Sequence, residues 1–199
     1  MKRRLRYQVA MSLDGFIAGP NGEYDWIVMD PSIDFTALYK EFDTAVMGRK
    51  TYAAAAAQGG HVEVPGLDVV VFSRTLAPLS ERRLRIVNDD AHAFVAALKK
   101  KPGRDIWLFG GGSLFQSLLD ARLVDSVEVA VIPVLLGEGI PLLPPGSRTK
   151  LRLVDQKILP ASGIVVLSYA VPGSAGPPAR IAYIKPARKR SAVKKKKKR

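Results

Sequence analysis

Short apolar runs alternate with amphipathic segments along most of the chain. Runs rich in β-branched and aromatic residues predict buried strands over 5–11, 44–47, 68–72, 84–87, 106–109 and 124–133. Apolar positions on one face predict helices over 32–42 and 89–98, the alanine-rich segment 50–57 predicts another, and a fourth is expected over 113–121 after three glycines. Two further strands, over 151–158 and 164–171, flank a turn and predict a closing hairpin. Because strands alternate with helices and then occur alone, we expect an α/β fold whose mostly parallel sheet ends in antiparallel strands.

The charge of the chain is concentrated at its C-terminal end. The net charge is +13, from 31 Lys and Arg against 18 Asp and Glu. Residues 180–199 hold 11 of the basic residues and no acidic one, which leaves 20 basic against 18 acidic residues, or +2, in 1–179. We therefore expect one nearly neutral domain over 1–172 and a basic, disordered tail over 173–199. The tail is suited either to contacting nucleic acid or acidic partners or to solubilising the domain.

Several classes of site and location are disfavoured by composition. The chain has no cysteine, which excludes disulfides, zinc–thiolate sites and thiol nucleophiles. Its two histidines, His61 and His92, argue against a metal site. No apolar run approaches the roughly 18–20 residues of a membrane span, and the basic N-terminus lacks the apolar core of a signal peptide. We expect a cytoplasmic protein that does not enter a membrane.

Three predicted strands end in turns that are suited to binding phosphate. Gly48-Arg49-Lys50-Thr51 offers a glycine, two cations and a hydroxyl at the start of a helix. Gly110-Gly111-Gly112-Ser113 lets a ligand approach the backbone closely before another helix. Ser73-Arg74-Thr75 combines a guanidinium with two hydroxyls, which suits a phosphate monoester. In open α/β sheets, ligands bind at the carboxyl ends of the strands.

Each turn also has an interpretation without a ligand. The first can be a tight turn with exposed basic residues, the second a glycine turn needed for helix–strand packing, and the third a solvated loop. The ordinary GxGxxG fingerprint of dinucleotide-binding folds is absent. Together, however, two turns for a diphosphate and one for a monoester match a single ligand, a dinucleotide with a 2′-phosphate.

Several segments, taken in order, resemble the dihydrofolate-reductase-like family. They are AMSLDGFIAGPNGEYDW, VMGRKTY, VVFSRT, IWLFGGGSLFQSLLDARLVDSVEV and PVLLGEGIPLL, within residues 4–171. They are most similar to the bacterial branch related to the reductase domain of the riboflavin-biosynthesis deaminase-reductase. The resemblance implies a mixed, mostly parallel sheet with helices on both faces, NADPH as cofactor and a small-molecule substrate. Related reductase domains often dimerise, so a homodimer is also expected.

The resemblance also assigns residues to the cofactor and the substrate. It implies that the nicotinamide end contacts Ala10 and Ile17, and that the adenosine ribose and its 2′-phosphate contact Ser73, Arg74 and Thr75. It implies that the diphosphate lies between Gly48, Arg49, Lys50 and Thr51 on one side and Gly111, Gly112, Ser113, Leu114 and Phe115 on the other, beside Gly110. Ser12, Asp14 and Trp26 would border the substrate, although Trp26 is equally suited to the core.

The substrate and the proton donor stay open at this level. Riboflavin-type reductase domains tend to carry an acidic residue where this chain has Phe109, and often a basic one where it has Phe16. Folate enzymes place a carboxylate early in the first helix, and Asp34 falls nearby. The expected reaction is hydride transfer from NADPH to a pterin-like or 5-amino-6-(5-phosphoribosylamino)uracil-like heterocycle, with Asp34 or water as proton donor. The alternative is an NADP-binding module without catalysis.

Overall fold

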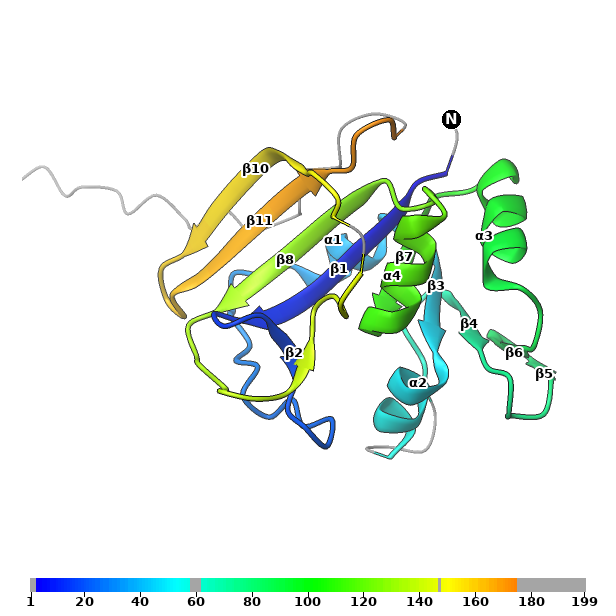
Figure 1. The fold of residues 1–199 in the computed structure, drawn as a ribbon, viewed down its shortest axis with the longest axis horizontal. Coiled ribbons are helices and arrows are strands. Elements are labelled where there is room, and N and C mark those ends of the chain that lie inside the picture. Colours follow the sequence, from blue (N-terminus) through cyan, green and yellow to red (C-terminus); the bar gives the residue numbers. More distant parts are fainter. Residues whose placement is uncertain (1–2, 58–61, 147, 175–199) are drawn as a thin grey trace, which may run out of the picture.

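A mixed sheet of nine strands forms the centre of the molecule (Figure 1). The structure is a computed structural model and describes residues 3–57, 62–146 and 148–174. The strands lie in the order β10-β11-β8-β1-β7-β3-β4-β6-β5. Their bounds are β1 Leu5–Ser12, β3 Phe42–Gly48, β4 Asp68–Phe72, β5 Leu79–Glu81, β6 Leu84–Val87, β7 Asp105–Gly110, β8 Ser126–Ile132, β10 Arg152–Leu159 and β11 Ile164–Ala170. Two short strands, β2 (Phe16–Ala18) and β9 (Ile140–Pro141), form a separate antiparallel ribbon.

The six central strands are parallel and the sheet is antiparallel at both ends. Parallel pairing joins β8 to β1, β1 to β7, β7 to β3, β3 to β4 and β4 to β6. The hairpin of β10 and β11 adds antiparallel strands beside β8, and β5 does so beside β6. The predicted α/β fold with a mostly parallel sheet and a C-terminal hairpin is therefore confirmed.

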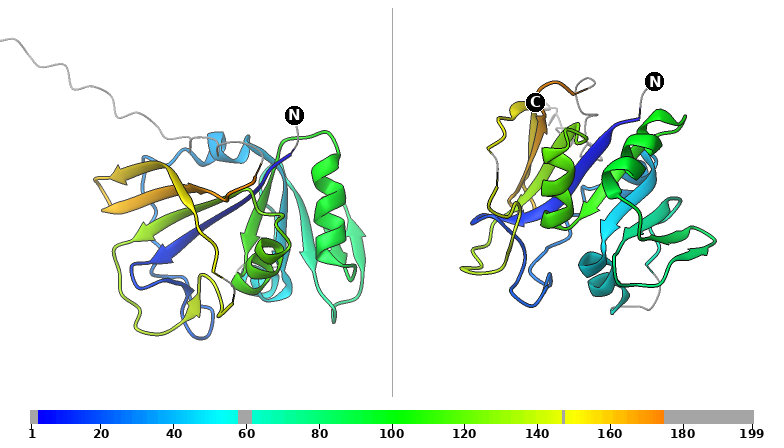
Figure 2. Two further views of the ribbon diagram at one scale, coloured as in Figure 1. Left: turned by 45° about the horizontal axis from the view of Figure 1, so that its top comes forward. Right: turned by 45° about the vertical axis from the view of Figure 1, so that its right-hand side comes forward.

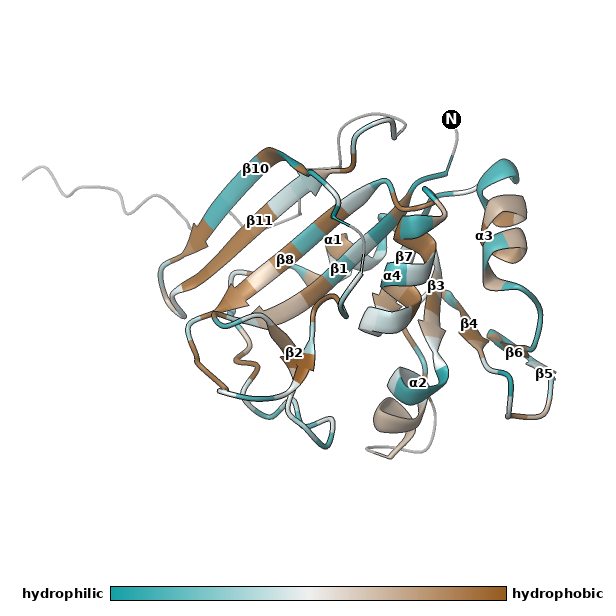
Figure 3. Cartoon of the chain, in the orientation of Figure 1, coloured by the Kyte–Doolittle hydropathy of each residue, from teal (hydrophilic) through white to brown (hydrophobic). Residues whose placement is uncertain are grey.

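Helices cover both faces of the sheet (Figures 1 and 2). Helices α3 (Ala91–Lys100) and α4 (Gly112–Asp120) lie on one face, and α1 (Phe35–Tyr39) lies on the other with α2 (Arg49–Ala56). Side chains alternate across β3, so that Val46 packs with α3 and α4 while Ala45 and Met47 pack toward α1. Hydrophobic residues, coloured brown in Figure 3, lie along the central strands of the sheet. Burying each large aliphatic side chain contributes about 1.5–3 kcal/mol, and this pattern fixes which face of the sheet each side chain points to.

Several predicted boundaries were wrong. The helix expected over 32–42 is only α1, because Asp34 begins it as N-cap and Phe42 instead starts β3, buried against Trp107 with ring centroids 5.4 Å apart. Helix α3 begins at Ala91 after its N-cap Asp90, two residues later than the predicted start at residue 89. The strands β2, β5 and β9 were missed because two or three residues are too short to show a periodicity. His61 and the tail beyond residue 174 lie outside the described residues.

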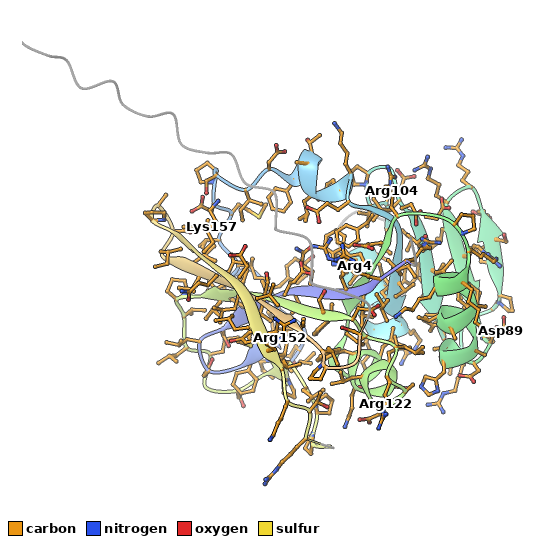
Figure 4. All side chains as sticks on the ribbon, turned by 90° about the horizontal axis from the view of Figure 1, so that it is seen from above. Arg4, Asp89, Arg104, Arg122, Arg152 and Lys157 are labelled. Carbon is orange, nitrogen blue, oxygen red and sulfur yellow. The ribbon has the colours of Figure 1, made fainter. Side chains whose placement is uncertain are left out.

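A network of charged side chains occupies the amino edge of the sheet. Arg6 has no exposed surface and makes two hydrogen bonds to Glu128, Nε to Oε1 at 2.8 Å and Nη2 to Oε2 at 2.7 Å. Its Nη1 donates to Glu41. Figure 4 shows Arg4 and Arg104 at this edge, and Arg4 pairs with Asp105. Arg4 and Arg6 are thus paired with carboxylates at the edge opposite the strand ends that carry the candidate turns.

None of the helices in the described ranges has the length and apolar character of a membrane span.

Candidate functional site

The three turns that were predicted to bind phosphate lie together at the carboxyl edge of the sheet. They follow β7, β3 and β4, which are neighbouring parallel strands. Met47 pairs with Gly110, and Gly48 pairs with Phe72, so each strand ends beside the next. Adjacent strands are about 4.8 Å apart, which places the three turns in one row. A dinucleotide could therefore span them with its diphosphate between β7 and β3 and its adenosine beside β4.

The glycine turn and the first basic turn are in direct contact. A Cβ atom added at Gly110 would lie 3.4 Å from Thr51 Oγ1, and one added at Gly111 would lie 3.2 Å from it. The peptide bond between Gly110 and Gly111 is cis. Thr51 is half-buried, whereas Arg49 and Lys50 are exposed. The glycines thus keep a small space open beside a hydroxyl, the kind of cradle that a phosphate oxygen fills.

Both helices at this contact begin without a side-chain cap. Helix α2 starts after Gly48 and α4 after Gly111. Glycine has no side chain that could accept a hydrogen bond from the first N–H groups of the helix. By contrast, Asp34 caps α1 and Asp90 caps α3 through their carboxylates. An uncapped helix start presents free N–H groups and a partial positive charge of roughly half a unit. Two such starts in contact favour a ligand with two negative groups, as in a diphosphate.

The loop after β4 presents some of its predicted residues and uses another internally. Arg74 and Thr75 are exposed. Ser73 is buried, and its Oγ accepts hydrogen bonds from Thr75 N at 3.1 Å and Leu76 N at 2.9 Å. Of the three predicted residues, Arg74 and Thr75 are therefore accessible and Ser73 holds the loop in shape, and the expected contact with a monoester stays a prediction.

Ser12 and Asp14 are engaged in hydrogen bonds within the protein. Ser12 is buried, its Oγ donates to Asp14 Oδ1 at 2.6 Å, and Oγ accepts from Phe16 N. Asp14 accepts from Leu136 N and, at 2.7 Å, from Gly137 N. The Ser12 hydroxyl and these N–H groups hold the pKa of the Asp14 carboxyl below its usual value. The pair fastens the end of β1 to the loop before β9, and its expected contact with substrate stays a prediction.

Asp34 lies between two residues that pack against different apolar clusters on the α1 face of the sheet. Its neighbour Ile33 packs with the cluster that contains Ala10 and Trp26, whereas Phe35 packs with the cluster around α1 and Trp107. Asp34 Oδ1 accepts from Ala37 N at 2.9 Å, and among the described residues no hydrogen bond to its Oδ2 is recorded. One carboxylate oxygen is thus left to interact with a ligand while the other caps the helix. Trp26 is half-buried and packs against the buried cluster that contains Ile132 and Ile164, and its expected contact with substrate stays a prediction.

The end of the PVLLGEGIPLL segment crosses the start of α4, a contact that the sequence did not predict. A Cβ atom at Gly112 would lie 2.9 Å from Pro141 O and 3.1 Å from Leu142 O. Gln116 Nε2 donates to Pro145 O at 3.0 Å, and Leu142 N donates to Gly15 O at 2.9 Å. This segment therefore connects the turn after β1 to the helix behind the glycine turn. Gly112 is required for this packing, because any side chain at this position would meet these carbonyl oxygens.

The other residues predicted to contact the cofactor differ in exposure. Ser113 is exposed, Leu114 is half-buried and Phe115 is buried, whereas Ile17 lies half-buried on β2.

Comparisons with known proteins agree with this fold. The chain resembles a dihydrofolate reductase from Enterococcus faecalis solved in complex with NADP(H) and RAB-propyl, with a TM-score of 0.65 and 16% identity over 86% of this chain and 99% of the other. The fold is therefore dihydrofolate-reductase-like.

Sequence comparison then gives the family. Residues 3–166 match the family model described as RibD C-terminal domain, and the chain belongs to this family. The uncharacterized protein YyaP of Bacillus subtilis is 36% identical over 180 residues, 84% of this chain and 95% of its own length. The riboflavin biosynthesis protein RibD of Corynebacterium ammoniagenes is 27% identical over 148 residues, covering 67% of this chain and 44% of RibD.

Proposed function

We propose that this protein is an NADPH-dependent reductase of a small heterocyclic substrate. The observation that supports it is the row of three turns at the ends of β7, β3 and β4, with Thr51 Oγ1 against the glycine turn. The residues present fit the cofactor, since two uncapped helix starts suit a diphosphate and Arg74 suits a 2′-phosphate. The resemblance to an NADP(H)-bound dihydrofolate reductase and to a RibD protein is consistent with this proposal.

In this proposal NADPH, when bound, supplies a hydride to a C=N or C=O bond, and the protein provides orientation and electrostatics. Gly48, Arg49, Lys50 and Thr51 would hold one side of the diphosphate and the Gly110–Ser113 turn the other. The nicotinamide end would lie beyond β7, toward Ala10 on β1. Holding the two reactants in near-attack geometry contributes up to roughly 7–11 kcal/mol. Asp34, or water, would deliver the proton to the reduced bond.

A fluorescence titration of NADPH and NADH tests the cofactor assignment. Arg74→Ala should weaken NADPH binding by about ten- to a hundredfold, because a charge-assisted contact contributes about 1.5–3 kcal/mol, and should leave NADH binding nearly unchanged. Arg83→Ala, which removes an exposed arginine between β5 and β6, is the matched control and should affect neither. Equal affinities of the unmodified protein for NADPH and NADH would count against the 2′-phosphate site.

The family's two types of substrate lead to two candidates for the reaction. An assay that follows the oxidation of NADPH by its absorbance, with dihydrofolate and with 5-amino-6-(5-phosphoribosylamino)uracil, would distinguish them. A second candidate function, an NADP-binding module without catalysis, is favoured by the internal bonding of Ser12, Asp14 and one oxygen of Asp34. Binding of NADPH without oxidation in a broader screen of heterocycles would support that second function.

The remaining expectations from the sequence stay predictions. They are a homodimer, a cytoplasmic location, and a tail over 173–199 that contacts nucleic acid or acidic partners. Deleting residues 173–199 tests the tail, since non-specific DNA binding that survives the deletion would refute its role.

A further inference from the structure

Asn88, which follows β6, makes two hydrogen bonds to the loop after β4. Its Nδ2 donates to Ser73 O at 2.5 Å and to Leu76 O at 3.0 Å. Fifteen and twelve residues separate Asn88 from these partners along the chain. Both amide hydrogens are therefore used to hold the two ends of one four-residue loop.

The same loop is braced from within. Ser73 Oγ accepts from the backbone N–H groups of Thr75 and Leu76. Together, Asn88 and this serine engage the carbonyl groups of Ser73 and Leu76 and the N–H groups of Thr75 and Leu76, which restrains the shape of the loop. The residues between, Arg74 and Thr75, are exposed, and no hydrogen bond of the Arg74 guanidinium is recorded within the described part of the chain.

This arrangement has an electrostatic consequence for an anion beside the loop. Carbonyl oxygens carry partial negative charge and repel a phosphate, whereas guanidinium and hydroxyl groups attract it. Asn88 binds the carbonyl oxygens of Ser73 and Leu76, so their negative ends face its amide. The loop is thereby held with cationic and hydroxyl groups available and two carbonyl groups engaged.

We propose that Asn88 is a positioning residue that gives this protein its preference for a cofactor with a 2′-phosphate. The inference rests on the proposed function, because it assumes that the Ser73–Thr75 loop meets the adenosine ribose. Asn88 acts through this loop and need not touch the cofactor.

Asp89 is the group that competes with this assignment. It is exposed and directly follows Asn88 (Figure 4). A carboxylate at a strand end suits the free ribose hydroxyls of NADH and repels a 2′-phosphate. Cofactor preference therefore depends on whether the loop held by Asn88 or the carboxylate of Asp89 dominates.

The test compares dissociation constants of NADPH and NADH for the unmodified protein, Asn88→Ala, Asn88→Asp and Asn88→Ser. Asn21→Ala is the matched control, since Asn21 also donates its amide within an exposed turn, to Glu23 Oε1 at 2.7 Å. Asn88→Ala should raise the constant for NADPH about tenfold, as expected from losing two neutral hydrogen bonds, and that for NADH less than about twofold.

The other variants grade the effect. Asn88→Asp should weaken NADPH binding further than Asn88→Ala, because its carboxylate repels both the carbonyl oxygens and the phosphate, and added salt should reduce the difference. Asn88→Ser keeps one short donor and should fall between the unmodified protein and Asn88→Ala. Thermal melts of each variant identify any loss of folding, and Asn21→Ala should leave the ratio of the two constants unchanged.

The possible outcomes distinguish a failure of the role of Asn88 from a failure of the proposed reductase function. A ratio of the NADPH and NADH dissociation constants that is unchanged in both Asn88→Ala and Asn88→Asp overturns the role of Asn88 and leaves the reductase proposal standing. Equal loss of NADPH and NADH binding also overturns it, because a merely structural residue would weaken both. A preference of the unmodified protein for NADH overturns the inference and the 2′-phosphate assignment together, and points to Asp89.

Discussion

The hydroxyl of Thr51 lies 3.2 Å from the position that a Cβ atom of residue 111 would occupy, so Gly111 and Thr51 share one small space. They come from different strand–helix turns, after β3 and β7. An alanine at position 111 would press against the Thr51 hydroxyl or displace it. The space therefore depends on both residues, and their substitutions should not act independently.

We predict that Gly111→Ala weakens NADPH binding through this contact. Thr51→Val, which removes the hydroxyl and keeps the shape, should weaken it by about ten- to a hundredfold if the hydroxyl donates to a phosphate. In the double variant the Gly111→Ala change should add little, because the hydroxyl that it displaces is already gone. Calorimetric titration of all three variants with NADPH measures this coupling. Strictly additive effects would contradict a shared space.

The sequence predicted what depends on local pattern. Asp68–Phe72 is a continuous apolar strand followed by a polar turn, and the structure contains this strand with the same bounds. That the three turns lie at one edge of the sheet was also predictable, because parallel strands end at the same edge. What pairs them in space is the strand order, which periodicity does not encode.

The rest depends on contacts between distant residues. In the sequence, Asn88 only marks the end of a predicted strand. The residues around it do not indicate that its amide binds Ser73 and Leu76. The crossing of Pro141 and Leu142 over Gly112 is equally invisible, because β9 has only two residues and is defined by its partner β2. Asp34 was selected for its place near a helix start, and the structure shows that it is also the cap.

We predict that Tyr7→Phe leaves the free energy of unfolding unchanged or raises it by about 1 kcal/mol. The Tyr7 ring is buried and stacks on Phe115 with centroids 3.9 Å apart, and its hydroxyl has no hydrogen-bond partner among the described residues. An unpaired buried hydroxyl costs about 1–3 kcal/mol, which its removal avoids. Burial also raises the pKa of this phenol above its usual range.

Urea denaturation of the unmodified protein and of Tyr7→Phe measures this effect. Tyr7→Leu is the companion variant, since it also removes the stacked ring and should destabilise the protein. A loss of more than about 1 kcal/mol in Tyr7→Phe would show that the hydroxyl has a partner, because a satisfied buried hydrogen bond contributes about that much.

We predict that acid loosens the loop at Leu136 and Gly137. Their N–H groups donate to Asp14, whose pKa lies below its usual value of 3.8 chiefly because the Ser12 hydroxyl donates to it. A carboxyl with a lowered pKa stabilises the fold while it is ionised, at pH above the unfolded value, and this contribution disappears as pH falls through the folded value. The attachment should therefore hold at neutral pH and weaken only below about pH 4.

Amide chemical shifts of Leu136 and Gly137, followed from pH 7 downward, measure this titration. In Asp14→Asn the shifts should no longer follow a carboxyl titration, because the side chain is neutral throughout. If the same titration persisted in that variant, the responsible carboxyl would be another one, and Asp14 would not control the loop.

We predict that Asp34→Asn separates catalysis from helix capping. Asparagine caps a helix about as well as aspartate, so α1 should form and the free energy of unfolding should change by less than about 0.5 kcal/mol. Asparagine cannot deliver a proton, and a positioned general acid contributes about 10²–10⁴-fold to the rate. The turnover rate with a reducible heterocycle should therefore fall by that factor while NADPH binding is unchanged.

Asp90→Asn is the matched control for this prediction. It makes the same change at the cap of α3, away from the predicted substrate side, and should leave turnover intact. If Asp34→Asn turned over as fast as the unmodified protein, the proton would come from water, and Asp34 would serve the helix alone.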